Sequence, residues 1–174
     1  MPALLLAACA GGDRQPQPQP SPTSQRTPYR PPAAAPRPAP ANAAYVATAA
    51  SIDLFEIRSS ELALQRSASR RVREFAEMMI AAHKGTSSQL SLAGRRLNLL
   101  PSASLNPQHQ AMLDRLRAAP NFDAMYRQQQ LAVHRQALAL HRDYWARGTS
   151  PTLRPVAIAA YPVIERHLRI ASYL

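Results

Sequence analysis

The chain has 174 residues, a single cysteine and a formal net charge of +11, and because Lys84 is its one lysine, arginine supplies nearly all of the positive charge. No run of apolar residues approaches the roughly 18 that a membrane-spanning helix needs, which excludes an integral membrane protein as the body of the chain. The arginines are scattered over every segment rather than gathered on one element between aromatic residues, which argues against a nucleic-acid-binding protein.

The first nine residues end in Leu6-Ala7-Ala8-Cys9. This stretch resembles the lipobox of bacterial lipoproteins, in which a branched residue and two small ones precede the cysteine that carries the lipid. The resemblance implies that residues 1–9 are a signal peptide and that Cys9 is lipidated. It also implies a cell-envelope protein on the outer membrane that faces the periplasm, since Ala10 is not an inner-membrane retention signal. Only eight residues precede Cys9, too few for a complete signal, so we expect either a start codon upstream or a coincidental match.

Residues 10–41 form a proline-rich segment. Ten of the 17 prolines fall here, in alternating Gln-Pro and Ala-Pro units without apolar periodicity. Such a composition favours an extended polyproline II conformation and does not bury a core. At ~3.1 Å per residue the segment reaches on the order of 90 Å when stretched. The sequence therefore predicts a disordered tether that holds the following domain away from a lipid anchor.

From residue 42 onward, apolar residues recur at helical spacing in five segments, at about 43–66, 67–97, 107–119, 121–147 and 151–173. We expect Asn42 to cap the first segment, Gly148 to end the fourth in the left-handed conformation, and Pro162 to kink the fifth. No stretch alternates polar and apolar residues as a strand does. Four long amphipathic helices and a short one predict an all-α domain at 42–174, built as a four-helix bundle.

Each long helix carries one ionisable residue within its apolar stripe, and these residues are Glu56, His83, His134 and His167. All four lie near the middle of their helices, so they are expected to point toward the bundle axis at a similar level. A buried charge must find a partner or become neutral. Their side chains are also metal ligands of the kind that Zn, Cu, Fe or Ni binds.

Two interpretations of this inward set remain open. One is a single divalent transition metal held by Glu56 and the three histidines, with Asp123, Tyr126, Gln130 and His141, all on the helix of His134, as the residues that support the ligands. The other is a metal-free polar network in which Glu56 accepts a hydrogen bond from a histidine. A further histidine, His109, lies between two glutamines in the short helix and is expected to be exposed.

Five segments of the domain together carry a resemblance through their order and spacing. They are LFEIRSSELAL at 54–64, FAEMMIAAH at 75–83, FDAMY at 122–126, AVHRQAL at 132–138 and YPVIERH at 161–167. In these segments the chain resembles the bacterial family of ferritin-like domains of unknown function, which are usually described as outer-membrane or periplasmic proteins. The resemblance implies a ferritin-like four-helix bundle, with the short helix in the crossover between helices two and three. Ala82 departs from the family, which usually has aspartate there, so the support of His83 is not evident.

Three hypotheses for function follow. The chain has no glycine-rich phosphate loop, serine nucleophile elbow or paired-cysteine motif, which favours a non-enzymatic envelope domain with an unknown ligand. The alternative is a metal-binding bundle with a redox or stress-related role. A di-iron centre is not expected, because it needs carboxylates from four helices and only Glu56 is predicted to face inward. The third is a basic domain that binds anionic envelope polymers through Arg70, Arg71, Arg73, Arg95 and Arg96.

Overall fold

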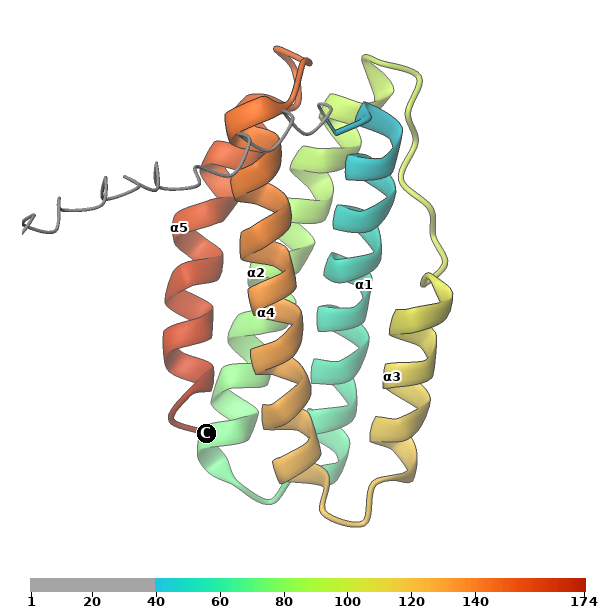
Figure 1. The fold of residues 1–174 in the computed structure, drawn as a ribbon. Coiled ribbons are helices and arrows are strands. Elements are labelled where there is room, and N and C mark those ends of the chain that lie inside the picture. The colour runs from blue at the N-terminus through green and yellow to red at the C-terminus, as the bar shows by residue number, and fades with distance from the viewer. Residues whose placement is uncertain (1–39) are drawn as a thin grey trace, which may run out of the picture. The chain divides into compact units, whose positions relative to one another are not determined.

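The structure, a computed structural model, describes residues 40–174, which form five α-helices and no strand (Figure 1). The helices are α1 (Asn42–Arg66), α2 (Arg70–Arg95), α3 (Pro107–Ala118), α4 (Phe122–Arg147) and α5 (Arg154–Ala171). The predicted all-α class is therefore confirmed for this part of the chain. Cys9, the lipobox and almost all of the proline-rich segment lie outside the described residues.

Side-chain caps begin three of the helices. The side chain of Ser69 accepts a hydrogen bond from the Val72 N–H, that of Asn106 from His109, and that of Asn121 from Ala124. The expectation for Asn42 is wrong, because Ala41 occupies the N-cap position of α1 without a side-chain hydrogen bond. The Asn42 side chain instead accepts a hydrogen bond of 2.5 Å from the Tyr144 hydroxyl. Asn42 is therefore used to join the start of α1 to the end of α4.

The end of α4 also differs from expectation. Gly148 does not adopt the left-handed conformation, since its φ is −61°. Glycine is needed there because the backbone passes close to the preceding turn: a Cβ atom at this position would lie 2.4 Å from the Tyr144 carbonyl oxygen and 2.6 Å from its ring. Close approach, rather than backbone conformation, explains the residue.

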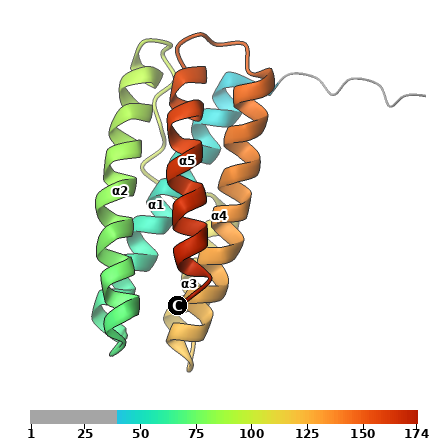
Figure 2. The same ribbon diagram turned by 90° about the vertical axis from the view of Figure 1, so that its left-hand side faces the viewer.

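The four long helices lie side by side, with α1 packed along α2 and α4 packed along α5 (Figures 1 and 2). Contacts of α1 with α4 and of α2 with α5 close the arrangement, while α3 packs on the outside against α1 and α4. Because α2 and α4 run in the same direction, the connection at 96–121 returns along the length of the domain and carries α3 (Figure 1). Within the described residues, no helix is long and apolar enough to cross a membrane.

Apolar side chains fill the interior of the domain in three layers, one at each end and one in the middle. One end contains Tyr45, Leu90, Tyr144 and Leu153, the middle contains Ile52, Phe55, Leu113, Val133 and Ile164, and the other end contains Phe75, Met79, Leu116 and Tyr126. Full burial of a large apolar side chain stabilises the fold by about 1.5–3 kcal/mol. These layers therefore offset the cost of the polar residues that are buried between them.

His109 is fully buried, so the expectation that it is exposed is wrong. The face of α3 that carries it packs inward, where its Nδ1 lies 2.7 Å from the Ser51 hydroxyl and its Nε2 lies 3.3 Å from Oε1 of Gln136. Burial lowers the pKa of His109. Since both ring nitrogens have partners, His109 joins α3 to α1 and α4 and is not available to a ligand.

Candidate functional site

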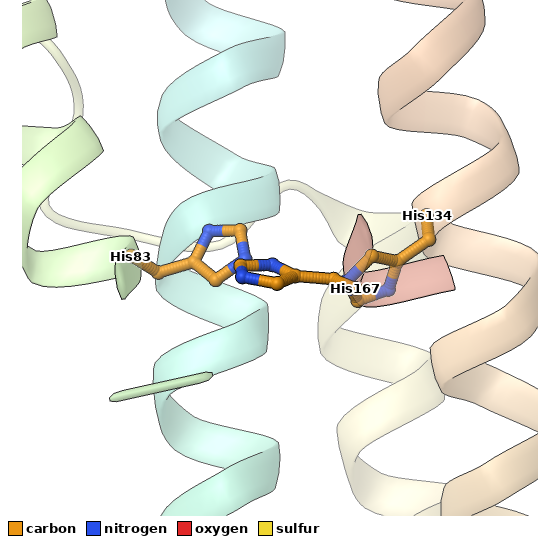
Figure 3. A group of neighbouring side chains, drawn as sticks. All are labelled: His83, His134 and His167. Atoms are coloured by element: carbon orange, nitrogen blue, oxygen red, sulfur yellow. The ribbon is translucent and has the colours of Figure 1, made fainter. Parts of the chain in front are cut away.

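Three histidines from three helices meet in the middle of the domain: His83 of α2, His134 of α4 and His167 of α5 (Figure 3). One ring nitrogen of each lies within 4.8 Å of one ring nitrogen of each of the others. Their exposed fractions are 3%, 1% and 3%. The helical stripes thus bring together three of the four ionisable residues expected to face inward.

The ring of His83 is held from α1 by Asp53. Nδ1 of His83 lies 2.8 Å from Oδ1 of Asp53, and the same carboxylate accepts hydrogen bonds from Thr86 at 2.8 Å and Ser87 at 3.2 Å. A neutral imidazole has one N–H donor and one acceptor nitrogen. When Nδ1 donates to Asp53, the lone pair of the ring is therefore on Nε2.

His134 is oriented in the same manner by its own helix. Its Nδ1 lies 2.8 Å from the backbone carbonyl oxygen of Gln130, one turn earlier in α4. Because a carbonyl oxygen only accepts, Nδ1 must be the donor and Nε2 must carry the lone pair. Two of the three rings are thus fixed in the tautomer that leaves Nε2 as an acceptor.

The nitrogens on the inner side of this group have no partner. Nε2 of His83, Nε2 of His134 and Nδ1 of His167 are buried and form no hydrogen bond within the described part of the chain. An unsatisfied buried polar group costs about 1–3 kcal/mol. A finished polar network would pair these atoms with one another or with neighbours, so the donor set fits a metal ion better than it fits a metal-free network.

The spacing of the nitrogens also suits one ion. A triangle whose sides are at the 4.8 Å limit has its centre about 2.8 Å from each corner, and a metal–imidazole bond measures about 2.0–2.1 Å. An inward shift of less than about 1 Å by each ring would complete such bonds.

Glu56 lies beside the three histidines rather than among them. It is 1% exposed, and its Oε1 is 3.3 Å from Nδ1 of His134, across the ring from the inward Nε2. Burial raises the pKa of Glu56 to about 7, although the nearby His83 and the adjacent Gln130 side chain act to lower it. The expected four-residue set is thus divided into three grouped imidazoles and one adjacent carboxyl group.

The four residues expected to support the ligands are spread along α4. Gln130 holds His134 through its carbonyl oxygen, and its side chain donates to Ser59. Tyr126 is paired with Ser60 at 2.8 Å, and His141 with Tyr45 at 3.1 Å. Asp123 is about 16 Å from His134 along the helix axis and only partly buried, so it does not take part.

Asp53 is the residue that the sequence reasoning missed. It is 7% exposed and lies three residues before Glu56, on the same side of α1. This spacing would have identified it, because residues three apart share a helix face. Asp53 supplies the support for His83 that Ala82 does not provide. It also corrects the expectation of one inward carboxylate, although both carboxylates come from one helix, unlike those of a di-iron site.

The arginines proposed to bind anionic polymers do not form one surface. Arg70, Arg71 and Arg73 lie at the start of α2, whereas Arg95 and Arg96 lie at its end, about 35 Å away. Arg70 pairs with Glu74, and Arg71 and Arg73 donate to the backbone carbonyl groups of Tyr173 and Leu64. The two groups of charges are therefore separate features of the surface.

Burial sets the protonation of the grouped histidines. It lowers the pKa of His134 to about 3 and that of His167 to about 4, in both cases with help from the charge of His83. Burial also acts to lower the pKa of His83, but the hydrogen bond and charge of Asp53 outweigh it, and the pKa is raised. At neutral pH, His134 and His167 are therefore in the neutral form that binds metals.

Comparisons with known proteins give a family and a fold. The family described as Domain of unknown function (DUF4142) matches residues 27–174. A structure of CopM in the Cu(II)-bound form aligns with a TM-score of 0.65 at 16% identity, over 75% of this chain and 93% of that chain. CopM in the Cu(I)-bound form aligns with the same TM-score at 14% identity, over 76% and 94%. A comparison with curated proteins finds no match.

The metal-free protein should lose stability as the pH falls from 7 to 4.5. Unfolded histidines bind protons near pH 6.5, but burial keeps the folded pKa of His134 at about 3 and those of His141 and His167 at about 4. The unfolded state therefore binds more protons in this range. Glu56, with its folded pKa of about 7, and His83, whose pKa is also raised, act in the opposite direction, but the three histidines with strongly lowered pKa values outweigh them. Urea unfolding with a chelator present should show a loss on the order of 2 kcal/mol per pH unit.

His141→Gln serves as a control for the pH experiment, because it removes one of the three histidines without touching the grouped nitrogens. Its free energy of unfolding should depend less steeply on pH than that of the wild type. A stability that stays constant or increases between pH 7 and 4.5 would contradict the burial of neutral imidazoles.

Proposed function

The chain belongs to the DUF4142 family, and we propose that its helical domain binds one copper ion between His83, His134 and His167. The observation that carries this proposal is the set of three buried imidazole nitrogens that face one another and have no hydrogen-bond partner among the described residues (Figure 3). Three imidazole nitrogens held at one point without partners form a metal-binding group that costs free energy to leave unliganded.

Two lines of reasoning select copper. Imidazole nitrogen suits Zn, Cu, Fe and Ni, and among the divalent first-row ions a nitrogen site binds Cu²⁺ most tightly. The fold is similar to that of CopM, whose two structures contain Cu(I) and Cu(II). The likeness supports copper as the first ion to test and does not identify the ligands.

The neighbouring residues are suited to hold a charged ion. Asp53 and the carbonyl group of Gln130 fix the rings of His83 and His134 with Nε2 turned inward. Partners of this kind orient metal-bound histidines and increase their basicity. Asp53 and Glu56 can together carry two negative charges beside the site, which would balance a doubly charged ion in a buried environment.

We further propose that the domain is a ferritin-like four-helix bundle without ferritin chemistry. The long connection between α2 and α4, which carries α3, supports the first part. The histidine-rich donor set, with its two carboxylates on α1, supports the second. Fold alone does not determine chemistry, and the donors argue for a mononuclear site.

The location that we propose is the outer membrane, facing the periplasm, with Cys9 as the lipid anchor. The support is the sequence Leu6-Ala7-Ala8-Cys9 followed by the proline-rich segment. A tether of this composition would let a metal-binding domain sample the space around its anchor.

Copper binding can be measured directly on the full-length, untagged protein purified without chelators. We expect one Cu(II) per chain by elemental analysis and nitrogen hyperfine structure in the electron paramagnetic resonance spectrum. His134→Gln should lower the affinity by at least about 100-fold, because loss of a ligand exceeds the 10–100-fold cost of losing a supporting group.

His109→Gln is the matched control for His134→Gln. It makes the same substitution at a buried histidine, but both ring nitrogens of His109 already have partners. The control should retain the affinity of the wild type. The proposal would be sunk if the wild-type protein retained no copper after desalting, or if the control lost as much affinity as His134→Gln.

Asp53→Asn should weaken copper binding about 10–100-fold, because it removes the charge that supports His83. The pH dependence of binding should change as well, since without Asp53 the pKa of His83 is no longer raised and a proton competes less with the metal. Asp114→Asn, at an exposed carboxylate on α3, should alter neither property. An Asp53→Asn protein with unchanged affinity and pH profile would show that Asp53 serves the fold alone.

The lipid anchor can be tested on the native protein isolated from its own cells. Mass spectrometry of the amino-terminal peptide should find Cys9 as the first residue, carrying a diacylglyceryl group and acyl chains. The protein should sediment with the outer membrane. Native protein with an unmodified Cys9 in the soluble fraction would contradict this location.

A further inference from the structure

The layer of three histidines has two different sides along the helix axes. On the side toward the start of α2 lie Gln130 and Glu56, where Nδ1 of His134 is bonded. On the side toward the end of α2, a cleft opens between α2 and α5. An ion at the centre would therefore have a closed polar side and an open one.

The cleft reaches the histidine layer at His83, the one of the three grouped histidines that lines it. Its inner end is formed by Asp53, His83 and His141, and its α5 wall by Val156, Ala160 and Ile164. With the open solvent at its mouth it measures about 370 Å³, and its enclosed part is no larger than one water molecule needs. Its enclosed part therefore admits about one water molecule, and a longer ligand must extend toward the open mouth of the cleft.

The number of protein ligands leaves one coordination position unfilled. The grouped donors are three imidazole nitrogens, and no carboxylate of the described residues belongs to the group. Glu56, the nearest unpaired carboxyl group on the closed side, contacts the opposite edge of the His134 ring. Three protein ligands with a fourth position open are the arrangement found in reactive rather than purely structural metal sites.

We propose that the ion bound by the three histidines takes a small exogenous molecule, water or an anion of up to three atoms, as its fourth ligand through the α2–α5 cleft. This inference rests on the proposed metal binding. The aliphatic α5 wall excludes larger and heavily hydrated ligands. The Asp53 carboxylate at the inner end is occupied by His83, Thr86 and Ser87, so it does not compete for the position.

Azide is a suitable probe, because it is a linear three-atom anion that binds Cu(II). Titrating azide into the copper-loaded full-length protein should produce a saturable azide-to-copper charge-transfer absorption and shift the electron paramagnetic resonance spectrum. Ala160→Leu fills the cleft and should weaken azide binding at least about tenfold, equivalent to 1.4 kcal/mol. Copper affinity should remain within about twofold, a change of about 0.4 kcal/mol, since Ala160 lies about two turns of α5 from His167.

Ala159→Leu is the matched control, because it adds the same side chain at the neighbouring, exposed position outside the cleft. It should bind azide as the wild type does. If Ala160→Leu does not fold, Ala160→Val tests the same wall with a smaller expected loss, about threefold.

Three results would overturn the inference. Copper-loaded wild type with no spectral response to azide would show that the position is closed or filled. Azide binding by Ala160→Leu or its valine counterpart that equals the wild type would show that the ligand does not use this cleft. Failure to bind copper at all would instead refute the proposed function, and this inference with it.

Discussion

Burial of three imidazoles with unpaired nitrogens is the constraint on which the rest of this structure depends. Each such nitrogen costs about 1–3 kcal/mol of folding free energy in an apolar interior, so other interactions of the fold must offset that cost. Compensation comes from the apolar layers built around Tyr45 and Tyr144 at one end and Phe75 and Met79 at the other. The nitrogens converge from three helices instead of pairing with neighbours, which is the arrangement that a shared ligand requires.

The rings of His134 and His83 donate to two different kinds of acceptor, of which one is uncharged and the other is a carboxylate. His134 donates to a backbone carbonyl oxygen, which carries no net charge and leaves the ring neutral at pH 7. His83 donates to Asp53, whose charge raises the pKa of the ring. In the proposed site a metal would compete with a proton chiefly at His83, and Asp53 would balance part of the charge of the ion. Support and charge compensation are thus supplied by the same residue.

Local patterns explain what the sequence could predict and where it could not. Helices, and the inward position of the three histidines, follow from a 3.6-residue period that is present in each segment by itself. The burial of His109 depends on which face of α3 packs against its neighbours, and no local pattern contains that information. Asp53 shares a helix face with Glu56, but its partner His83 lies on another helix, and no local pattern shows that contact. Asn42 and Gly148 are residue types that commonly cap helices, but here contacts with Tyr144 explain why each residue is present.

The composition of the donor set separates this domain from carboxylate-rich metal sites built on bundles of helices. Four helices that each contribute carboxylates create a strongly negative interior, which suits two hard ions. Here the converging donors are neutral nitrogens from α2, α4 and α5, and both inward carboxylates come from α1. Neutral donors attract an ion through ligand chemistry more than through charge, which favours copper over harder ions that prefer oxygen. The cleft between α2 and α5 joins the Asp53 carboxylate at its inner end to an aliphatic wall on α5, and in the proposed site this is the side from which the ion would exchange its fourth ligand.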